Sequence, residues 1–187
     1  MVRDPPPARG NVSGGGDAPL IVTALLPRDL QARFTALRRA YFPPERNFLE
    51  AHVTLFHALP AMCEGEALTL LKRMAAEFAP VEARVEGLMA LGGGTAIKLS
   101  SPAMLDLRAM MAEHFRGMLT QQDQHRPRLH VTIQNKVPGK EARALQEALA
   151  GTIAPQGFAF RGLALHRYRG GPWEPIKEFA FRGRGAP

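Results

Sequence analysis

Two short stretches of the chain carry the same pattern, and they constrain its fold more than any other feature. Residues 52–55 read HVTL and residues 130–133 read HVTI. In an extended strand, residues two apart point to the same face, about 7 Å apart along the chain. The His and Thr of each stretch therefore share one face, and the aliphatic residues share the opposite face. The pattern predicts two β-strands, each with a buried apolar face and a reactive polar face.

The elements predicted around these stretches recur in the same order. The first half predicts a strand over 20–26, a helix between Pro27 and Pro43, the first His strand over 51–57, a helix over 64–78 and a strand over 81–91. The second half predicts a strand over 95–99, a helix from Pro102 whose apolar face runs to Met118, the second His strand over 129–135, a helix over 140–149, a strand over 158–168 and a last strand over 176–182. Equivalent elements are offset by 74 to 78 residues, which indicates an internal duplication.

The duplication predicts two lobes related by a pseudo-two-fold axis, with a cleft between them. We expect a single bilobal domain over residues 19–183, with a first repeat over about 20–91, a second over about 94–168 and the final strand over 176–182. A pseudo-two-fold axis would bring the two His strands together across the cleft. Residues 1–18 are rich in Pro and Gly and nearly devoid of large apolar side chains, which predicts a disordered tail.

The composition is that of a globular chain, since 45% of the residues are hydrophobic and 22% are charged. A single cysteine, Cys63, excludes an intrachain disulfide framework and is expected to pack as a small hydrophobe. No apolar run approaches the roughly 20 residues that a membrane span requires, and the N-terminus lacks the apolar core of a signal peptide. We therefore expect a cytoplasmic protein with no membrane partner. No obligate protein partner is evident, which favours a monomer.

Two imidazoles that face each other across a cleft suit proton transfer at a phosphodiester. Histidine titrates near neutrality, so one ring can take a proton from an attacking water or hydroxyl while the other gives a proton to the leaving oxygen. The Thr54 and Thr132 hydroxyls beside the rings would bind the non-bridging phosphoryl oxygens. Such a reaction needs neither a metal nor a covalent intermediate. Each stretch alone also fits an ordinary half-buried strand, so the hypothesis depends on the matched pair.

The paired H-x-T-x stretches at residues 52–55 and 130–133 resemble the signature of the 2H phosphoesterase superfamily. The chain looks most like the bacterial and archaeal branch of 2′-5′ RNA ligases and cyclic nucleotide phosphodiesterases, over residues 20–182 and including the duplicated element order. The resemblance implies a bilobal α+β fold, with two pseudo-symmetric lobes of mainly antiparallel sheet, helices on the outer faces and an active-site cleft between the lobes. It also implies metal-independent phosphodiester chemistry, without a cofactor, on 2′,3′-cyclic phosphate ends or 2′-5′ linkages. The residues to which it assigns catalytic roles are His52, His130, Thr54 and Thr132.

Two departures from the family pattern lie beside the motifs. Ligase-like members often carry Arg five residues after the second His, where this chain has Asn135 followed by Lys136. After the first motif, a Phe-Leu-Gly type of ending is replaced by Phe56, His57 and Ala58. We expect a phosphodiesterase that acts on 2′,3′-cyclic phosphate ends of nucleotides or RNA. The alternatives are a 2′-5′ RNA ligase, a hydrolase of another phosphodiester such as a phosphopantetheine-like ester, and an RNA-binding protein without catalysis.

Basic and aromatic side chains around the second motif and near the C-terminus are candidates for substrate contacts. They are Lys136, Arg128, Arg126, Tyr168 and Trp173. Residues 121–187 carry eleven Lys or Arg against five Asp or Glu, which suits a phosphate-bearing partner such as an RNA end or a cyclic nucleotide. The three basic residues flank the motif, where they could bind phosphate oxygens or be solvated charges at the ends of a strand. The two aromatic residues could stack on a base or pack a hairpin turn.

The sequence predicts no metal site, because the ligand spacings H-E-x-x-H and C-x-x-C are absent. It also contains no P-loop, G-x-S-x-G or dinucleotide fingerprint, and residues 92–94 lack the Lys and Ser or Thr of a phosphate cradle. An ATP-dependent ligase is therefore not predicted. Strand alternation places His57 on the core side, and His114, His125 and His166 belong to no motif.

Overall fold

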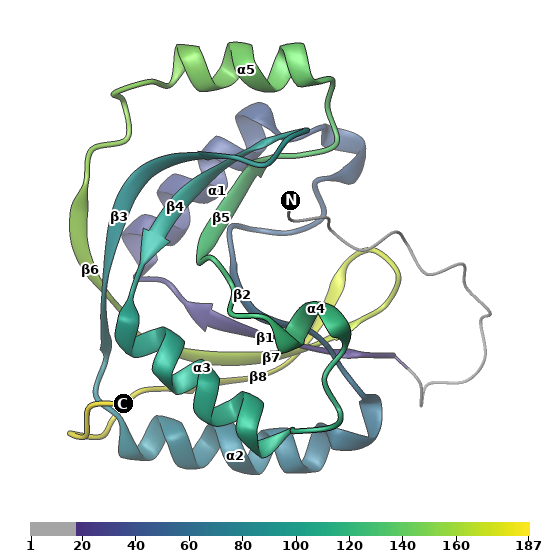
Figure 1. Ribbon diagram of the computed structural model, residues 1–187, viewed down its shortest axis with the longest axis vertical. Helices are drawn as coiled ribbons and strands as arrows, with labels where there is room; N and C mark the ends of the chain where they lie inside the picture. The colour runs from purple at the N-terminus through teal and green to yellow at the C-terminus, as the bar shows by residue number, and fades with distance from the viewer. Residues whose placement is uncertain (1–17) are drawn as a thin grey trace.

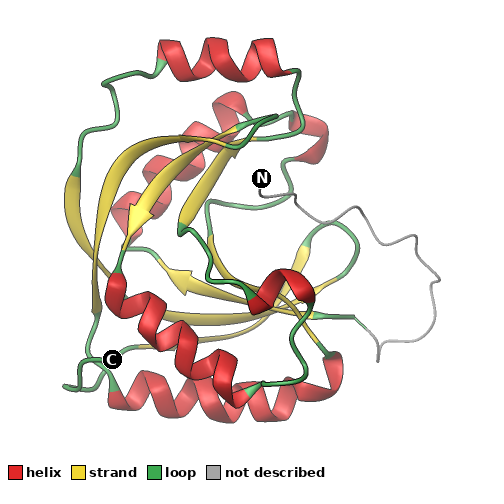
Figure 2. Ribbon diagram, in the orientation of Figure 1, coloured by secondary structure: helices red, strands yellow, loops and turns green. Residues whose placement is uncertain are grey.

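The computed structural model describes residues 18–187, which form two four-stranded antiparallel sheets (Figures 1 and 2). The first sheet has the order β2 (Val53–Leu59), β1 (Leu20–Leu25), β7 (Gly162–Tyr168), β8 (Trp173–Ala180). The second sheet has the order β5 (His130–Gln134), β4 (Thr95–Ser100), β3 (Val81–Ala90), β6 (Gln156–Phe160). The tail predicted over residues 1–18 lies outside the described residues, apart from Ala18.

Helices cover the sheets from outside. They are α1 (Arg28–Tyr41), α2 (Glu64–Glu77), α3 (Pro102–His114), α4 (Gln121–Gln124) and α5 (Gly139–Ala148), with short 3₁₀ turns η1 (Pro44–Arg46) and η2 (Ala61–Cys63). Helix α2 packs on β7 and β8, whereas α1 packs on β5, and α2 and α5 lie at opposite ends of the molecule (Figure 1). Within residues 18–187, no helix is both long and apolar enough to cross a membrane. The predicted bilobal α+β fold is confirmed.

The two sheets do not coincide with the two sequence repeats. Strand β3 belongs to the first repeat, yet it pairs with β4 in the second sheet. Strand β7 belongs to the second repeat, yet it pairs with β1 in the first sheet. Each repeat therefore gives a late strand to the sheet of the other repeat. The single strand predicted over 158–168 is wrong for the same reason, because β6 ends at Phe160 and the chain then crosses to begin β7 in the other sheet.

The apolar faces of the two motif strands lie in one continuous hydrophobic core. Val53, Leu55, Val131 and Ile133 are all fully buried, as the two-residue alternation predicts. Burying an aliphatic side chain of this size stabilises the fold by about 1.5–3 kcal/mol relative to leaving it exposed. Their burial fixes the register of β2 and β5, since a slip by one residue would turn every side chain to the opposite face.

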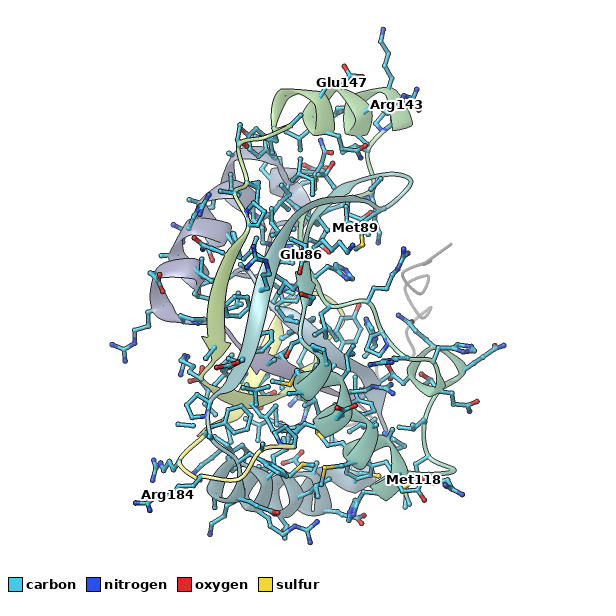
Figure 3. All side chains as sticks on the ribbon, turned by 60° about the vertical axis from the view of Figure 1, so that its left-hand side comes forward. Glu86, Met89, Met118, Arg143, Glu147 and Arg184 are labelled. Atoms are coloured by element: carbon cyan, nitrogen blue, oxygen red, sulfur yellow. The ribbon has the colours of Figure 1, made fainter. Side chains whose placement is uncertain are left out.

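Two predicted element ends differ from the observed ones. The Ser101 side chain caps α3 by accepting a hydrogen bond from the Met104 backbone N–H, as a helix that begins at Pro102 requires. The helix ends at His114, however, so Met118 lies beyond it and is exposed at the periphery of the molecule (Figure 3). The last strand begins at Trp173 rather than at residue 176, so Trp173 is part of the β7–β8 hairpin.

Gly162 stands where the chain passes from one sheet to the other. A Cβ atom at this position would lie 2.2 Å from the carbonyl oxygen of Phe179, which is far closer than van der Waals contact. We expect Gly162→Ala to lower the free energy of unfolding by about 1–3 kcal/mol, because the β7–β8 backbone must move to admit the methyl group. Urea unfolding followed by circular dichroism measures this loss.

Gly157→Ala, at an exposed position of β6, is the matched control. A Cβ atom there meets nothing within 4 Å, so the free energy of unfolding should change by less than about 0.5 kcal/mol. Equal losses in the two variants would contradict the steric explanation.

Candidate active site

The two motif strands are edge strands, and they meet in the middle of the molecule. Strand β2 is at the edge of the first sheet and β5 is at the edge of the second. The two edges contact each other (Figure 1). The structure therefore brings the two H-x-T stretches together at the boundary between the lobes, although 78 residues separate them in sequence.

Each motif His has its ring held by the same local contact. Nδ1 of His52 lies 2.8 Å from the carbonyl oxygen of Glu50, and Nδ1 of His130 lies 2.7 Å from the carbonyl oxygen of Arg128. A carbonyl oxygen only accepts, so Nδ1 must carry the proton and donate it. In the neutral form, both rings therefore hold their lone pair at Nε2, the nitrogen that would exchange a proton with a ligand.

The surroundings of His52 strongly favour its neutral form. Its ring packs against the Trp173 ring, with centroids 4.5 Å apart and an interplanar angle of 53°. Burial, followed by repulsion from Arg38, lowers the pKa of His52 to about 3, and weaker repulsion from His166 and His130 acts in the same direction. His52 is therefore neutral at pH 7. The influence of His130 on this pKa also reflects the proximity of the two rings.

The two motif Thr residues lie on the polar faces beside the rings. Thr54 pairs across the sheet with Thr23 of β1, and Thr132 pairs with Ala96 of β4. Both motif Thr residues are half-buried. The backbone carbonyl of Thr132 accepts a hydrogen bond of 2.7 Å from Nη1 of Arg38.

The β7–β8 hairpin forms an aromatic wall beside His52. Tyr168 and Trp173 pair directly across its two strands, and the Trp173 ring contacts the His166 ring at 5.5 Å as well as that of His52. An ion pair from Arg167 to Glu64 ties the hairpin to α2, and a second from Arg167 to Glu174 joins the two strands of the hairpin. Trp173 thus packs within the hairpin, which was one of the two interpretations, and its ring also contacts that of His52.

The three basic candidates have different settings in the structure. Arg128 is exposed, and its backbone carbonyl anchors the His130 ring. Lys136 lies beyond the end of β5 in a left-handed turn with φ 59°, so the strand does not carry it onto the face of His130. Arg126 is exposed and lines a cavity of about 650 Å³ alongside α3 and α4.

Two residues that the sequence analysis missed lie on the same polar faces. Lys98 pairs directly across from His130, so the two side chains share a face with Cβ atoms about 5 Å apart. His166 has Nε2 3.1 Å from Oγ1 of Thr23, and burial lowers its pKa, against the opposing effect of Glu178. The sequence signal for Lys98 was a lysine between aliphatic residues in the strand over 95–99. No local signal in the sequence marked His166.

The expectation that His57 faces the core is wrong. The pairing of β1 with β2 is irregular between Leu20 and Val22, and this bulge turns His57 outward, with 32% of its side chain exposed. The carboxylate of Asp123, only 1% exposed, accepts hydrogen bonds from the His57 ring and from the backbone N–H groups of His57 and Ala58. Burial raises the pKa of Asp123, but these hydrogen bonds lower it by more. Asp123 therefore pins α4 to β2 as a carboxylate.

Within residues 18–187, no group of three or more His, Cys, Asp or Glu side chains is arranged to hold a metal ion. The potential ligands at the lobe boundary are imidazoles and hydroxyls, which suit proton transfer and hydrogen bonding to a phosphate.

Two lobes that each place an H-x-T strand at their common boundary define a 2H phosphoesterase. The family model of the 2′-5′ RNA ligase superfamily matches residues 26–172, and the chain belongs to this superfamily. No curated protein sequence matches the chain.

Solved structures show the same fold at low sequence identity. The protein TT0787 of Thermus thermophilus is 20% identical with a TM-score of 0.61, over 89% of this chain and 100% of that chain. E. coli LigT complexed with NADP+ is 18% identical with a TM-score of 0.58, over 89% of this chain and 99% of that chain. E. coli LigT complexed with 3′-AMP is 19% identical with a TM-score of 0.57, over 88% of this chain and 98% of that chain.

The environment of His52 predicts an unusual titration. In an NMR titration of the ring protons, His52 should stay neutral from pH 5 to 8 and titrate near pH 3. Trp173→Leu should raise this pKa toward 6.5, because it exposes the ring to water. Since the folded-state pKa is depressed, the associated stability is complete above about pH 6.5 and declines as the pH falls toward 3.

Tyr168→Leu is the matched control for this titration. Tyr168 lies directly across from Trp173 on β7, and the ring packed against His52 is that of Trp173. The control should leave the titration of His52 unchanged. A wild-type His52 that titrates near 6.5 would contradict the burial of its ring.

Proposed function

We propose that the protein is a phosphodiesterase that opens 2′,3′-cyclic phosphate ends of nucleotides or RNA, using no metal and no cofactor. The observation that carries the proposal is the meeting of two H-x-T strands at the lobe boundary, with both imidazoles anchored through Nδ1. Two rings that both exchange protons through Nε2 can act on one phosphoryl group, one as a general base and the other as a general acid.

In the proposed mechanism, His52 acts as the general base. Its ring is neutral at pH 7, so Nε2 takes a proton from the water that attacks phosphorus. His130, in its protonated form, gives a proton to the leaving ribose oxygen as the bond from phosphorus to that oxygen breaks. The product is a ribose phosphomonoester with a free neighbouring hydroxyl. The hydroxyls of Thr54 and Thr132 donate hydrogen bonds to the non-bridging oxygens, where negative charge accumulates in the transition state.

The surroundings of the rings support a nucleotide substrate. Lys98 stands beside His130 and can attract a phosphate, and the Trp173 ring beside His52 offers a face for a base or ribose. E. coli LigT was solved in complex with 3′-AMP. Hydrolysis of a 2′,3′-cyclic phosphate of adenosine yields 3′-AMP or its 2′ isomer, so a ligand of that type fits the proposed reaction.

The central test is turnover of 2′,3′-cyclic nucleotides and cyclic-ended oligonucleotides in the presence of EDTA. We expect His52→Ala and His130→Ala each to reduce kcat/KM by about 10²–10⁴-fold, because each removes one proton-transfer group. Both variants should keep the wild-type circular dichroism spectrum, since neither side chain belongs to the hydrophobic core. His125→Ala, at an exposed position outside the motifs, should retain full activity.

The outcomes of this test separate the rival functions. Activity lost in EDTA would sink the metal-independent mechanism. Cleavage or joining of 2′-5′ linked RNA with inert cyclic phosphates would replace the proposed substrate. RNA binding that falls with salt, without any product, would favour a binding protein over an enzyme.

Lys98 provides a test of substrate length. Lys98→Met should raise KM several-fold for a cyclic-ended trinucleotide and leave kcat unchanged, because a lysine beside His130 can bind the next phosphodiester along the strand. The effect should be smaller for a cyclic mononucleotide, which lacks that phosphodiester. The matched control is Lys72→Met, an exposed position on α2 outside both polar faces. Equal effects of Lys98→Met on both substrates would contradict the assignment.

A further inference from the structure

Two arginines are buried where the sequence pattern gives no reason for them. Arg38 of α1 is 3% exposed and Arg108 of α3 is 5% exposed. Each guanidinium lies over an aromatic ring, with Arg38 at 4.3 Å from the Phe42 centroid and Arg108 at 4.4 Å from the Phe56 centroid. Moving a guanidinium from water into the fold costs free energy unless hydrogen bonds compensate for the lost hydration.

Arg38 joins the second motif strand to the segment that leads into the first motif. Its Nη1 donates to the carbonyl oxygen of Thr132 at 2.7 Å, and its Nε donates to the carbonyl oxygen of Leu49 at 3.2 Å. Its Nη2 donates to the side-chain oxygen of Asn47 at 3.2 Å. All three partners are neutral oxygen atoms. The charge is therefore not cancelled locally, although burial lowers the pKa of Arg38 only to about 10, so the residue stays charged at pH 7.

Arg108 makes the reciprocal connection. Its Nε donates to the carbonyl oxygen of Leu55, inside the first motif, at 3.4 Å. Its Nη2 donates to the backbone carbonyl oxygen of Asp123, in the segment that leads into the second motif. The Asp123 carboxylate in turn binds the backbone N–H groups of His57 and Ala58 just beyond the first motif.

The two connections follow the pseudo-two-fold arrangement of the chain. Each arginine comes from the helix that precedes its own motif strand, binds a carbonyl shortly before that strand, and reaches a carbonyl inside the motif strand of the other repeat. A planar guanidinium with several fixed donors can span two carbonyls in this way, whereas a lysine ammonium is a single point of attachment.

We propose that Arg38 and Arg108 are paired positioning residues that cross-brace the two H-x-T strands and so set the placement of His52 relative to His130. The proposal rests on the proposed function for its catalytic consequence. The braces are alike in geometry and differ in electrostatics, because repulsion from Arg38 contributes to the low pKa of His52 and Arg108 makes no such contribution. Arg38 thus fixes the position of the ring and also favours its neutral form.

The test compares Lys and Met substitutions at both positions. Arg38→Lys and Arg108→Lys keep the charge but lose the bridging fork, so each should lower kcat at least tenfold with KM changed less than twofold. Arg38→Met should also raise the pKa of His52 in an NMR titration, because it removes a nearby positive charge. Arg38→Lys and Arg108→Met should leave that pKa close to its wild-type value. Arg39→Met, an exposed neighbour on α1, should change neither quantity.

The two readouts separate this proposal from the proposed function. Wild-type protein that turns over no cyclic phosphate would contradict the proposed function. The His52 titrations do not depend on turnover, so they would still test the role of Arg38. If both Lys variants kept the wild-type kcat, or if a lower melting temperature were their only change, the arginines would have a structural role alone. Either outcome would overturn the proposal. A Met variant that does not fold is replaced in the titration by Arg38→Gln, which should raise the pKa of His52 in the same way. An unchanged pKa in the folded neutral variant would also overturn the proposal.

Discussion

The site depends on holding two sheet edges against each other although they belong to different sheets. An edge strand presents backbone carbonyls that no neighbouring strand satisfies. On β2 and β5, guanidinium groups from helices that start in the opposite repeat take up two of these carbonyls, at Leu55 and Thr132. These carbonyl oxygens could otherwise pair the two edges into one sheet. Because the arginines bind them, the two edges stay separate on either side of the site.

Strand exchange ties the two repeats of the sequence together. Because β3 and β7 each complete the sheet of the other repeat, neither lobe can be assembled from one contiguous half of the chain. The hydrophobic core is continuous across both sheets, so the lobes share their packing as well as their strands. A hinge motion between the lobes would have to open this shared core. The distance between the two motifs is therefore a property of the whole fold.

The sequence predicts those features that local periodicity controls. Two-residue alternation gives the buried faces of β2 and β5, and helical spacing gives α1 and α2. It does not give the sheet order, because the choice of pairing partner is made by distant segments. In the sequence, Arg38 resembles the solvated arginines beside it on α1. It is buried only because that helix packs across β5. The bulge at His57 and the crossing at Gly162 likewise leave no trace in the alternation, since each arises from a contact with a distant residue.

The local anchoring of the two imidazoles has a consequence for how such a pair arises. Each ring donates to a carbonyl two residues earlier in its own segment, so its orientation is inherited with the segment when the segment is copied. Duplication alone then yields two equivalent groups. The Trp173 ring, in a strand beyond the duplicated unit, then packs on one of them, His52. The C-terminal hairpin thus gives the first of the two rings a contact that duplication did not supply.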